Sequence, residues 1–507
     1  MRTNKFYFTV VVICCLLVNA GCVEAQKKET PKKTQSESEI KAKAEQERIA
    51  LENLIFDAQA QQAEIAADAL IRLVESNKSI STQRKTELLE EAFRRASEAQ
   101  HPIRLGYAGV IDTRSGMLSE ALDLELDKLS LQSRVVKAML ALDKKRAREM
   151  FNEIPSKLPL TPVGCKEGFI FPNVDKVYET LSAILASTFT EKEKKQDAHI
   201  FYALPYIESM NSPAQIVPII KTILSLKPNQ IQLSILAGTF TRTLKNLPGD
   251  DHSFRQSMSS NKTTSQIINL RKAYNDRQLP DHELIEVFRT YLLKQLNGTR
   301  CSDGLKFNMN TPLASKYVLP NYVEFVNANL LTNNPITAEQ IEPFKVENAE
   351  NSPEYYHDLG EENRLEKYRK LRFTSQDKEI SEVEKEQDEW QVGFSQLLND
   401  VVAWTPNDIL ADQDYFHQKC IFFQSLIEIA PKDKLELRVN AFNQYLFFVS
   451  NSSMQRENRA EWLMQAQRLL DLIVAAREEE KIILQAALEK TSNVTLNLYL
   501  KLKTFNK

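Results

Sequence analysis

Glycine is scarce in this sequence, with 12 residues in 507. Soluble proteins use glycine for about 7% of their residues, because hairpin turns and phosphate-binding loops need its conformational freedom. The strong helix formers Leu, Ala, Glu, Lys, Gln and Arg are abundant instead. We therefore predict an all-α fold: an array of antiparallel helical hairpins, solenoid-like or a bundle, with essentially no β-sheet.

The sequence motifs of common catalytic sites are also absent. The six histidines are scattered, and HExxH, GxSxG, GxxxxGK[ST] and GxGxxG do not occur. His417 and Cys420 lie one helical turn apart, but zinc needs three or four ligands and no CxxC or HxxxH pair accompanies them. We predict no catalytic, cofactor-binding or metal-binding residues, and the balance favours a protein that is not an enzyme.

Neither sign of charge is in large excess. The chain carries 65 basic and 68 acidic residues, a net charge of −3, and the two signs are mixed along it. Nucleic-acid binding needs clustered Lys and Arg. We therefore expect no nucleic-acid partner, and expect other proteins as partners instead.

Long apolar runs are absent except at the start. Arg2 and Lys5 precede an uncharged run from Phe6 to Val18, and small residues follow it. This is the pattern of a secretory signal peptide over residues 1–25, and the run is too short for an ordinary membrane-spanning helix of about 20 residues. We therefore expect an exported protein, periplasmic, extracellular or anchored in the envelope.

The cleavage point has alternatives. Small residues permit a cut after Ala25 or after Ala20. Ala20-Gly21-Cys22 also resembles a bacterial lipoprotein box, although Asn19 stands where such boxes usually carry an aliphatic residue. That resemblance implies lipidation of Cys22, which would be the protein's link to a membrane.

Hydrophobic periodicity divides the rest of the chain. We predict a polar linker over 26–38, an N-terminal helical domain over 39–297, an irregular loop-rich segment over 298–375, and a C-terminal helical domain over 376–507. A single long helix is expected over 39–76. Thr190 and Ser212 open capping boxes that mark helix starts. The tryptophans Trp390, Trp404 and Trp462 are expected in the core.

One predicted helix pair suggests a repeat unit. Helices over about 213–226 and 230–246 meet at Lys227-Pro228-Asn229. This hairpin resembles a unit of the tetratricopeptide and HEAT-like helical-repeat proteins, here of the bacterial cell envelope. The resemblance is architectural, because no consensus recurs at a fixed period. It implies an α-solenoid that binds other proteins or scaffolds an assembly.

Two cysteines share a local sequence. Cys165 in GCKEGFIF and Cys301 in TRCSDGLKF are each followed by an acid and a glycine two and three residues later. Acid-Gly pairs favour tight turns, so we expect both cysteines in loops. An exported protein can form disulfides, and a Cys165–Cys301 bridge is the favoured pairing, with another pairing or reduced thiols as alternatives. Cys420, in an apolar helix, is expected to act as a small core residue.

Two other functions stay open at this point. The chain could be a secreted enzyme on an (α/α) scaffold that acts on polysaccharide, and segment 298–375 would then line its cleft. It could also carry an apolar ligand in a hollow between helices. The leading hypothesis remains an exported helical-repeat protein that binds proteins or scaffolds an assembly.

Overall fold

The chain divides into two compact units, residues 1–51 and 52–507. The computed structural model describes residues 37–77, 79–99, 125–160, 174–249, 261–297, 300–301, 318–341, 346–347, 359–374, 378–379, 388–405, 412–432, 434–452, 459–491 and 493–505. In the first unit these residues form the start of helix α1 (Glu37–Gln59), which ends in the second unit. All other described elements belong to the second unit.

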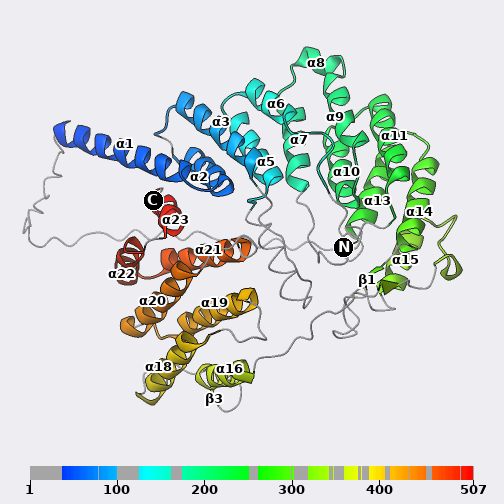
Figure 1. Cartoon of the computed structure of the whole chain (residues 1–507). Helices are drawn as coiled ribbons and strands as arrows, with labels where there is room; N and C mark the ends of the chain where they lie inside the picture. Colours follow the sequence, from blue (N-terminus) through cyan, green and yellow to red (C-terminus); the bar gives the residue numbers. More distant parts are fainter. Residues whose placement is uncertain are drawn as a thin grey trace, which may run out of the picture. The chain divides into compact units, whose positions relative to one another are not determined.

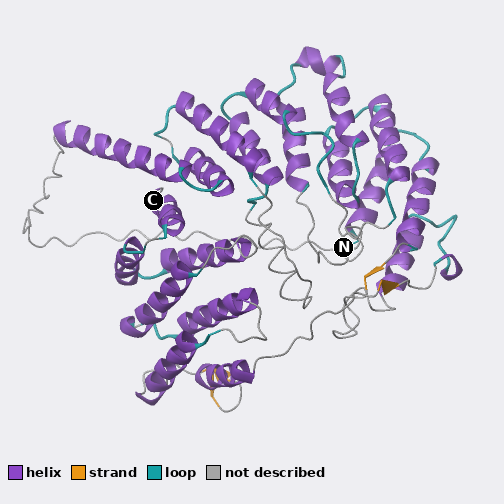
Figure 2. Cartoon of the chain, viewed as in Figure 1, coloured by secondary structure: helices purple, strands orange, loops and turns teal. Residues whose placement is uncertain are grey.

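The predicted all-α fold is confirmed (Figures 1 and 2). Strands among the described residues are two residues long: β1 (Arg300–Cys301), β2 (Val346–Glu347), β3 (Phe373–Thr374) and β4 (Lys378–Glu379). β1 pairs with β2 in parallel, and β3 pairs with β4 antiparallel.

The helices from α2 to α15 form what we call the N-terminal array. Neighbouring hairpins pack side by side, so that α5, α7, α10 and α13 contact one another in succession, as do α9, α11 and α14 (Figure 1). The helices are α2 (Ala63–Ser76), α3 (Thr82–Glu98), α5 (Lys128–Leu140), α6 (Lys144–Asn152), α7 (Asp175–Ser187), α8 (Glu191–Lys195), α9 (Ala198–Glu208), η2 (Pro213–Gln215), α10 (Ile216–Ser225), α11 (Gln230–Asn246), α13 (Lys262–Asn275), α14 (His282–Leu296), α15 (Val318–Asn329) and η3 (Ala338–Gln340).

The remaining helices form the C-terminal array, in which each helix packs on those one or two places along the chain. They are α16 (Leu359–Arg372), α18 (Asp388–Ala403), α19 (Asp412–Ile429), α20 (Leu435–Asn451), α21 (Arg459–Ala475), α22 (Glu478–Glu489) and α23 (Val494–Phe505). The three tryptophans are buried here, as predicted. The indole of Trp390 donates to the carbonyl of Leu371, and that of Trp462 to the carbonyl of Val449, so their polar atoms are satisfied.

Local sequence signals placed several helix starts correctly. The capping boxes at Thr190 and Ser212 both form, and the hairpin of α10 and α11 meets at the predicted turn. The single helix expected over 39–76 is wrong, because the chain turns after α1 and Gln62 adopts an extended backbone before α2. No Pro or Gly marks this break. Segment 298–375 contains α15, η3 and α16 among its described residues.

The two arrays meet through the last helix. α23 packs on α21 and α22 of its own array and also on α2, near the start of the N-terminal array. Helices from opposite ends of the chain are therefore direct neighbours.

Candidate functional site

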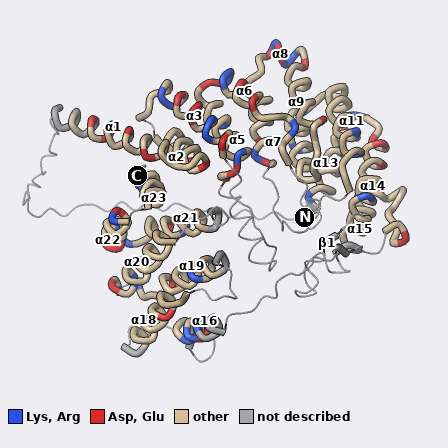
Figure 3. The backbone as a smooth tube through the Cα atoms, viewed as in Figure 1, with Lys and Arg blue, Asp and Glu red and all other residues tan. Residues whose placement is uncertain are grey.

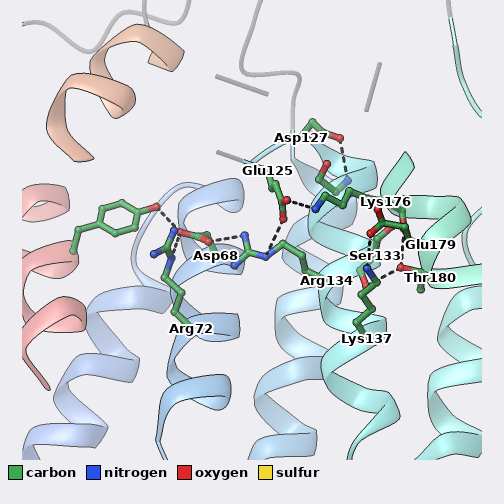
Figure 4. A network of polar contacts seen from close by, with 12 residues as sticks. Asp68, Arg72, Glu125, Asp127, Ser133, Arg134, Lys137, Lys176, Glu179 and Thr180 are labelled. Carbon is green, nitrogen blue, oxygen red and sulfur yellow. Dashed lines mark hydrogen bonds and ion pairs between the residues drawn. The ribbon is translucent and has the colours of Figure 1, made fainter. Parts of the chain in front are cut away.

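The candidate functional site is a group of charges around the buried Asp68, where α2 meets α23 (Figure 4). Asp68 lies in the middle of α2, a largely apolar helix, and its side chain has no exposed surface. Arg72, one turn later, donates Nε to Oδ2 at 2.8 Å, and Arg134 of α5 donates Nη1 to Oδ1 at 2.7 Å. The hydroxyl of Tyr499 on α23 donates to Oδ2 at 2.9 Å. We call these four residues the Asp68 cluster.

The electrostatics keep the Asp68 cluster charged. Burial alone would raise the pKa of Asp68, but the charges of Arg72 and Arg134 outweigh it and hold that pKa below 3.8. Burial beside the Asp68 carboxylate raises the pKa of Tyr499 well above 10.0. The carboxylate is therefore ionised and the phenol protonated at neutral pH.

Further ion pairs extend from the Asp68 cluster along α5 and α7. Glu125, just before α5, lies 3.9 Å from Arg134 and 2.5 Å from Lys176 of α7. Lys137 of α5 pairs with Glu179 of α7 at 2.9 Å. The hydrogen bond to Glu125 raises the pKa of Lys176, and the bond from Lys137 lowers the pKa of Glu179. These charges hold each other in place and tie α2, α5 and α7 together.

The arrangement does not suit acid–base chemistry. A general base needs a pKa near the working pH, whereas Asp68 is shifted downward and Tyr499 upward. Both carboxylate oxygens of Asp68 already accept hydrogen bonds from within the cluster. The cluster can instead fix one helix against another, because a buried charge network is satisfied in one geometry only.

A second buried charge lies in the C-terminal array. The ammonium of Lys419 on α19 donates to the carbonyls of Val402 at 3.0 Å and Trp404 at 2.7 Å, and to the hydroxyl of Tyr415 at 3.0 Å. The ring of Phe448 lies 4.8 Å from the same nitrogen. Lys419 therefore satisfies carbonyls at the C-terminal end of α18, which is a structural role.

The pKa of Lys419 responds to this burial. The residue is 4% exposed, and burial followed by repulsion from Arg364 lowers its pKa to about 8. Such a value suits a nucleophilic lysine, but here the nitrogen is turned toward three protein acceptors.

Three exposed apolar side chains occur near the N-terminal ends of α9 and α11. Phe201 on α9 is 56% exposed, and Ile231 and Ile235 on α11 are 71% and 37% exposed. The two helices are in contact, and Gln232 donates to Asp197 at 2.5 Å, which joins their N-terminal ends. The three side chains, which we call the outer apolar patch, therefore lie at the same end of neighbouring helices. Basic and acidic positions are interspersed along much of the described backbone (Figure 3).

The predicted cysteine sites are only partly covered. Cys22 and Cys165 lie outside the described residues, so lipidation and the Cys165–Cys301 bridge remain predictions. The expected loop is wrong for Cys301, whose backbone lies in β1 and pairs with Glu347 of β2. A pairing with a segment so far along the chain leaves no local signal. Cys420 is a buried thiol in α19, as expected.

The described part of the chain lacks two further features. It holds no group of three His, Cys, Asp or Glu residues that could bind a metal ion. It also holds no helix long and apolar enough to span a bilayer.

The Asp68 cluster was missed by sequence reasoning. One local signal was present, since Asp68 and Arg72 stand four residues apart on a largely apolar helix. Nothing in the sequence pairs them with Tyr499, 431 residues from Asp68.

No family model, curated protein or solved structure matches the chain.

Proposed function

We propose that the chain is an exported helical-array protein of the cell envelope that binds another protein through the outer apolar patch. The observation that carries this proposal is the grouping of Phe201, Ile231 and Ile235 at one end of α9 and α11. Single exposed apolar residues are ordinary, but grouped ones mark interaction surfaces. Burying them against a partner contributes about 25 cal/mol for each Å² of apolar surface covered.

The N-terminal array gives this patch a firm base. Beneath it, Ile200, Leu233 and Leu236 are fully buried, so α9 and α11 are held by their inner faces while the patch projects outward. A rigid apolar surface loses little side-chain entropy on binding. The outer apolar patch is therefore suited to act as a preformed docking surface.

Photo-cross-linking in the producing cells tests the proposal. A photoreactive amino acid is placed at Ile231, or at Ile482 on α22 as a control with nearly the same exposure, 68% against 71%. We expect a defined protein adduct from position 231 and none from 482. Phe201→Asp should abolish the adduct, because a charge in the patch opposes its desolvation.

Two outcomes would contradict the proposed binding face. One is the same set of adducts from both positions, which means random collision. The other is an adduct at position 231 that persists unchanged with Phe201→Asp, which means that the patch does not hold the partner.

Export is tested separately. Cell fractionation and mass spectrometry of the mature N-terminus should show loss of residues 1–25, or a lipid on Cys22. A full-length chain that begins at Met1 and remains in the cytosol would refute this part of the proposal.

A further inference from the structure

The packing of the chain gives no reason for a glycine at position 238, in the middle of α11. The sequence uses glycine sparingly, with 12 in 507 residues, and glycine inside a helix is destabilising relative to alanine. Close packing explains two other glycines, because a Cβ at Gly393 would lie 3.2 Å from Leu371, and one at Gly249 would lie 2.9 Å from the carbonyl oxygen of Lys294. At Gly238, an added Cβ would meet no described part of the chain within 4 Å besides its own helix backbone.

Gly238 belongs to a regular stripe on the outward face of α11. The stripe, which we call the α11 outer stripe, is spaced at alternating steps of four and three residues and consists of Ile231, Ile235, Gly238, Arg242 and Lys245. This is the spacing at which one helix of a coiled coil meets another. The four side chains of the stripe are exposed. The stripe therefore presents an apolar end, a gap at the glycine and a basic end.

The basic end lacks acidic partners within the described part of the chain. Arg242 donates to the neutral hydroxyl of Thr239 at 3.1 Å. Neither Arg242 nor Lys245 forms an ion pair with a described carboxylate, and this includes the exposed Glu208 of the neighbouring α9. Two such cations on one helix face favour a partner that brings carboxylates to them.

We propose that the partner of the outer apolar patch binds as an amphipathic α-helix along the α11 outer stripe, with carboxylates facing Arg242 and Lys245. The inference rests on the proposed function, because it describes how the same partner binds. A large apolar side chain of the partner helix lies over Gly238, where the missing side chain lets it approach the backbone of α11. Ile231 and Ile235 contact the apolar end of the same helix.

Cross-linking in the producing cells, with the photoreactive amino acid at position 231, tests the role of the glycine. Gly238→Leu fills the gap and should lower the yield of the protein adduct by about tenfold. Leucine favours a helix more than glycine does, and the space around position 238 is open. Thermal unfolding should therefore show a variant at least as stable as the native chain, so that loss of the adduct reports binding and not folding.

A charge reversal tests the basic end in the same assay. Arg242→Glu combined with Lys245→Glu should lower the yield of the adduct by about threefold or more, because the partner's carboxylates then face like charges. The matched control is Lys262→Glu combined with Lys272→Glu, at two exposed lysines of α13, and it should leave the yield unchanged.

The outcomes separate this inference from the proposed function. Absence of a defined adduct from position 231 in the native chain would contradict the proposed function itself. An adduct that Gly238→Leu or the α11 charge reversal leaves unchanged would overturn the helix along α11 and leave the binding face standing. Mass spectrometry of the cross-linked partner peptide should find apolar residues three and four apart, with Asp or Glu within the next two turns. A peptide from a second copy of this chain, or one without such acids, would also overturn the inference.

Discussion

The buried ammonium of Lys419 gives a stability that depends on pH in a defined direction. The test substitution is Lys419→Met, which keeps the length and apolar stem of the side chain and removes its charge. The free energy of unfolding of this variant is compared with that of the native chain from pH 7 to pH 9.5.

The magnitude follows from the pKa of Lys419. Burial lowers that pKa from 10.5 to about 8, and the gap corresponds to about 3 kcal/mol. Between these two values the unfolded chain binds a proton that the folded chain has released. Stability therefore rises with pH in this window, by up to about 1.4 kcal/mol per pH unit. Well below pH 8 Lys419 is protonated in both the folded and the unfolded state, and it contributes no slope.

Urea denaturation followed by circular dichroism measures the effect. Other titrating groups are the same in the two proteins, so the difference between their unfolding free energies isolates Lys419. We expect the native chain to gain about 2 kcal/mol on the variant between pH 7 and pH 9.5, most of it above pH 8. Lys370→Met, at a side chain that is 73% exposed, is the control for the substitution itself.

A difference that stays constant from pH 7 to pH 9.5 would refute this reasoning. It would mean that the bonds from Lys419 to Val402, Trp404 and Tyr415 keep the ammonium charged despite its burial. Hydrogen bonding would then outweigh desolvation at this site.

Three other predictions concern stability and oxidation. Asp68→Asn should lower the free energy of unfolding at pH 7 by about 3–5 kcal/mol. Because the pKa of Asp68 is held below 3.8, the native chain should lose this advantage as the pH falls below about 4, and the acid denaturation curves of the two proteins should converge. Gly249→Ala should destabilise the chain by about 1–3 kcal/mol, because a Cβ there would lie 2.9 Å from a backbone oxygen of α14. Gly238→Ala in α11 should instead stabilise the chain by about 0.5–1 kcal/mol, because the space around that position is open. Thermal unfolding measures both changes. Alkylation of the protein isolated from cells, without reductant, should leave Cys165 and Cys301 unmodified, because a bridge removes both thiols. Alkylation of either thiol would exclude the bridge.

Structural features that depend on a few neighbouring residues were predictable from the sequence. The capping box at Thr190 forms because its hydroxyl and the carboxylate of Glu193, three residues on, satisfy each other's backbone amides. The burial of Trp390 and Trp462 followed from their places on apolar stripes. The helical class likewise follows from composition summed over the whole chain.

Features that depend on distant partners were not predictable. The break between α1 and α2 has no Pro or Gly at Gln62, and nearby apolar residues continue the helical spacing across it. The role of Asp68 depends on Arg134 and Tyr499, which only the packing of separate helices brings to it. Its local partner Arg72 alone would suggest a solvated surface pair.

The contact between α2 and α23 also means that one of these helices is made long before the other. A ribosome adds about 5–20 residues each second, so the 431 residues between Asp68 and Tyr499 take roughly 20–90 s to make. During that interval α2 exists without the helix that covers it. Its ionised carboxylate keeps the uncovered surface polar, which makes the growing chain less prone to aggregate than an apolar face in the same place would.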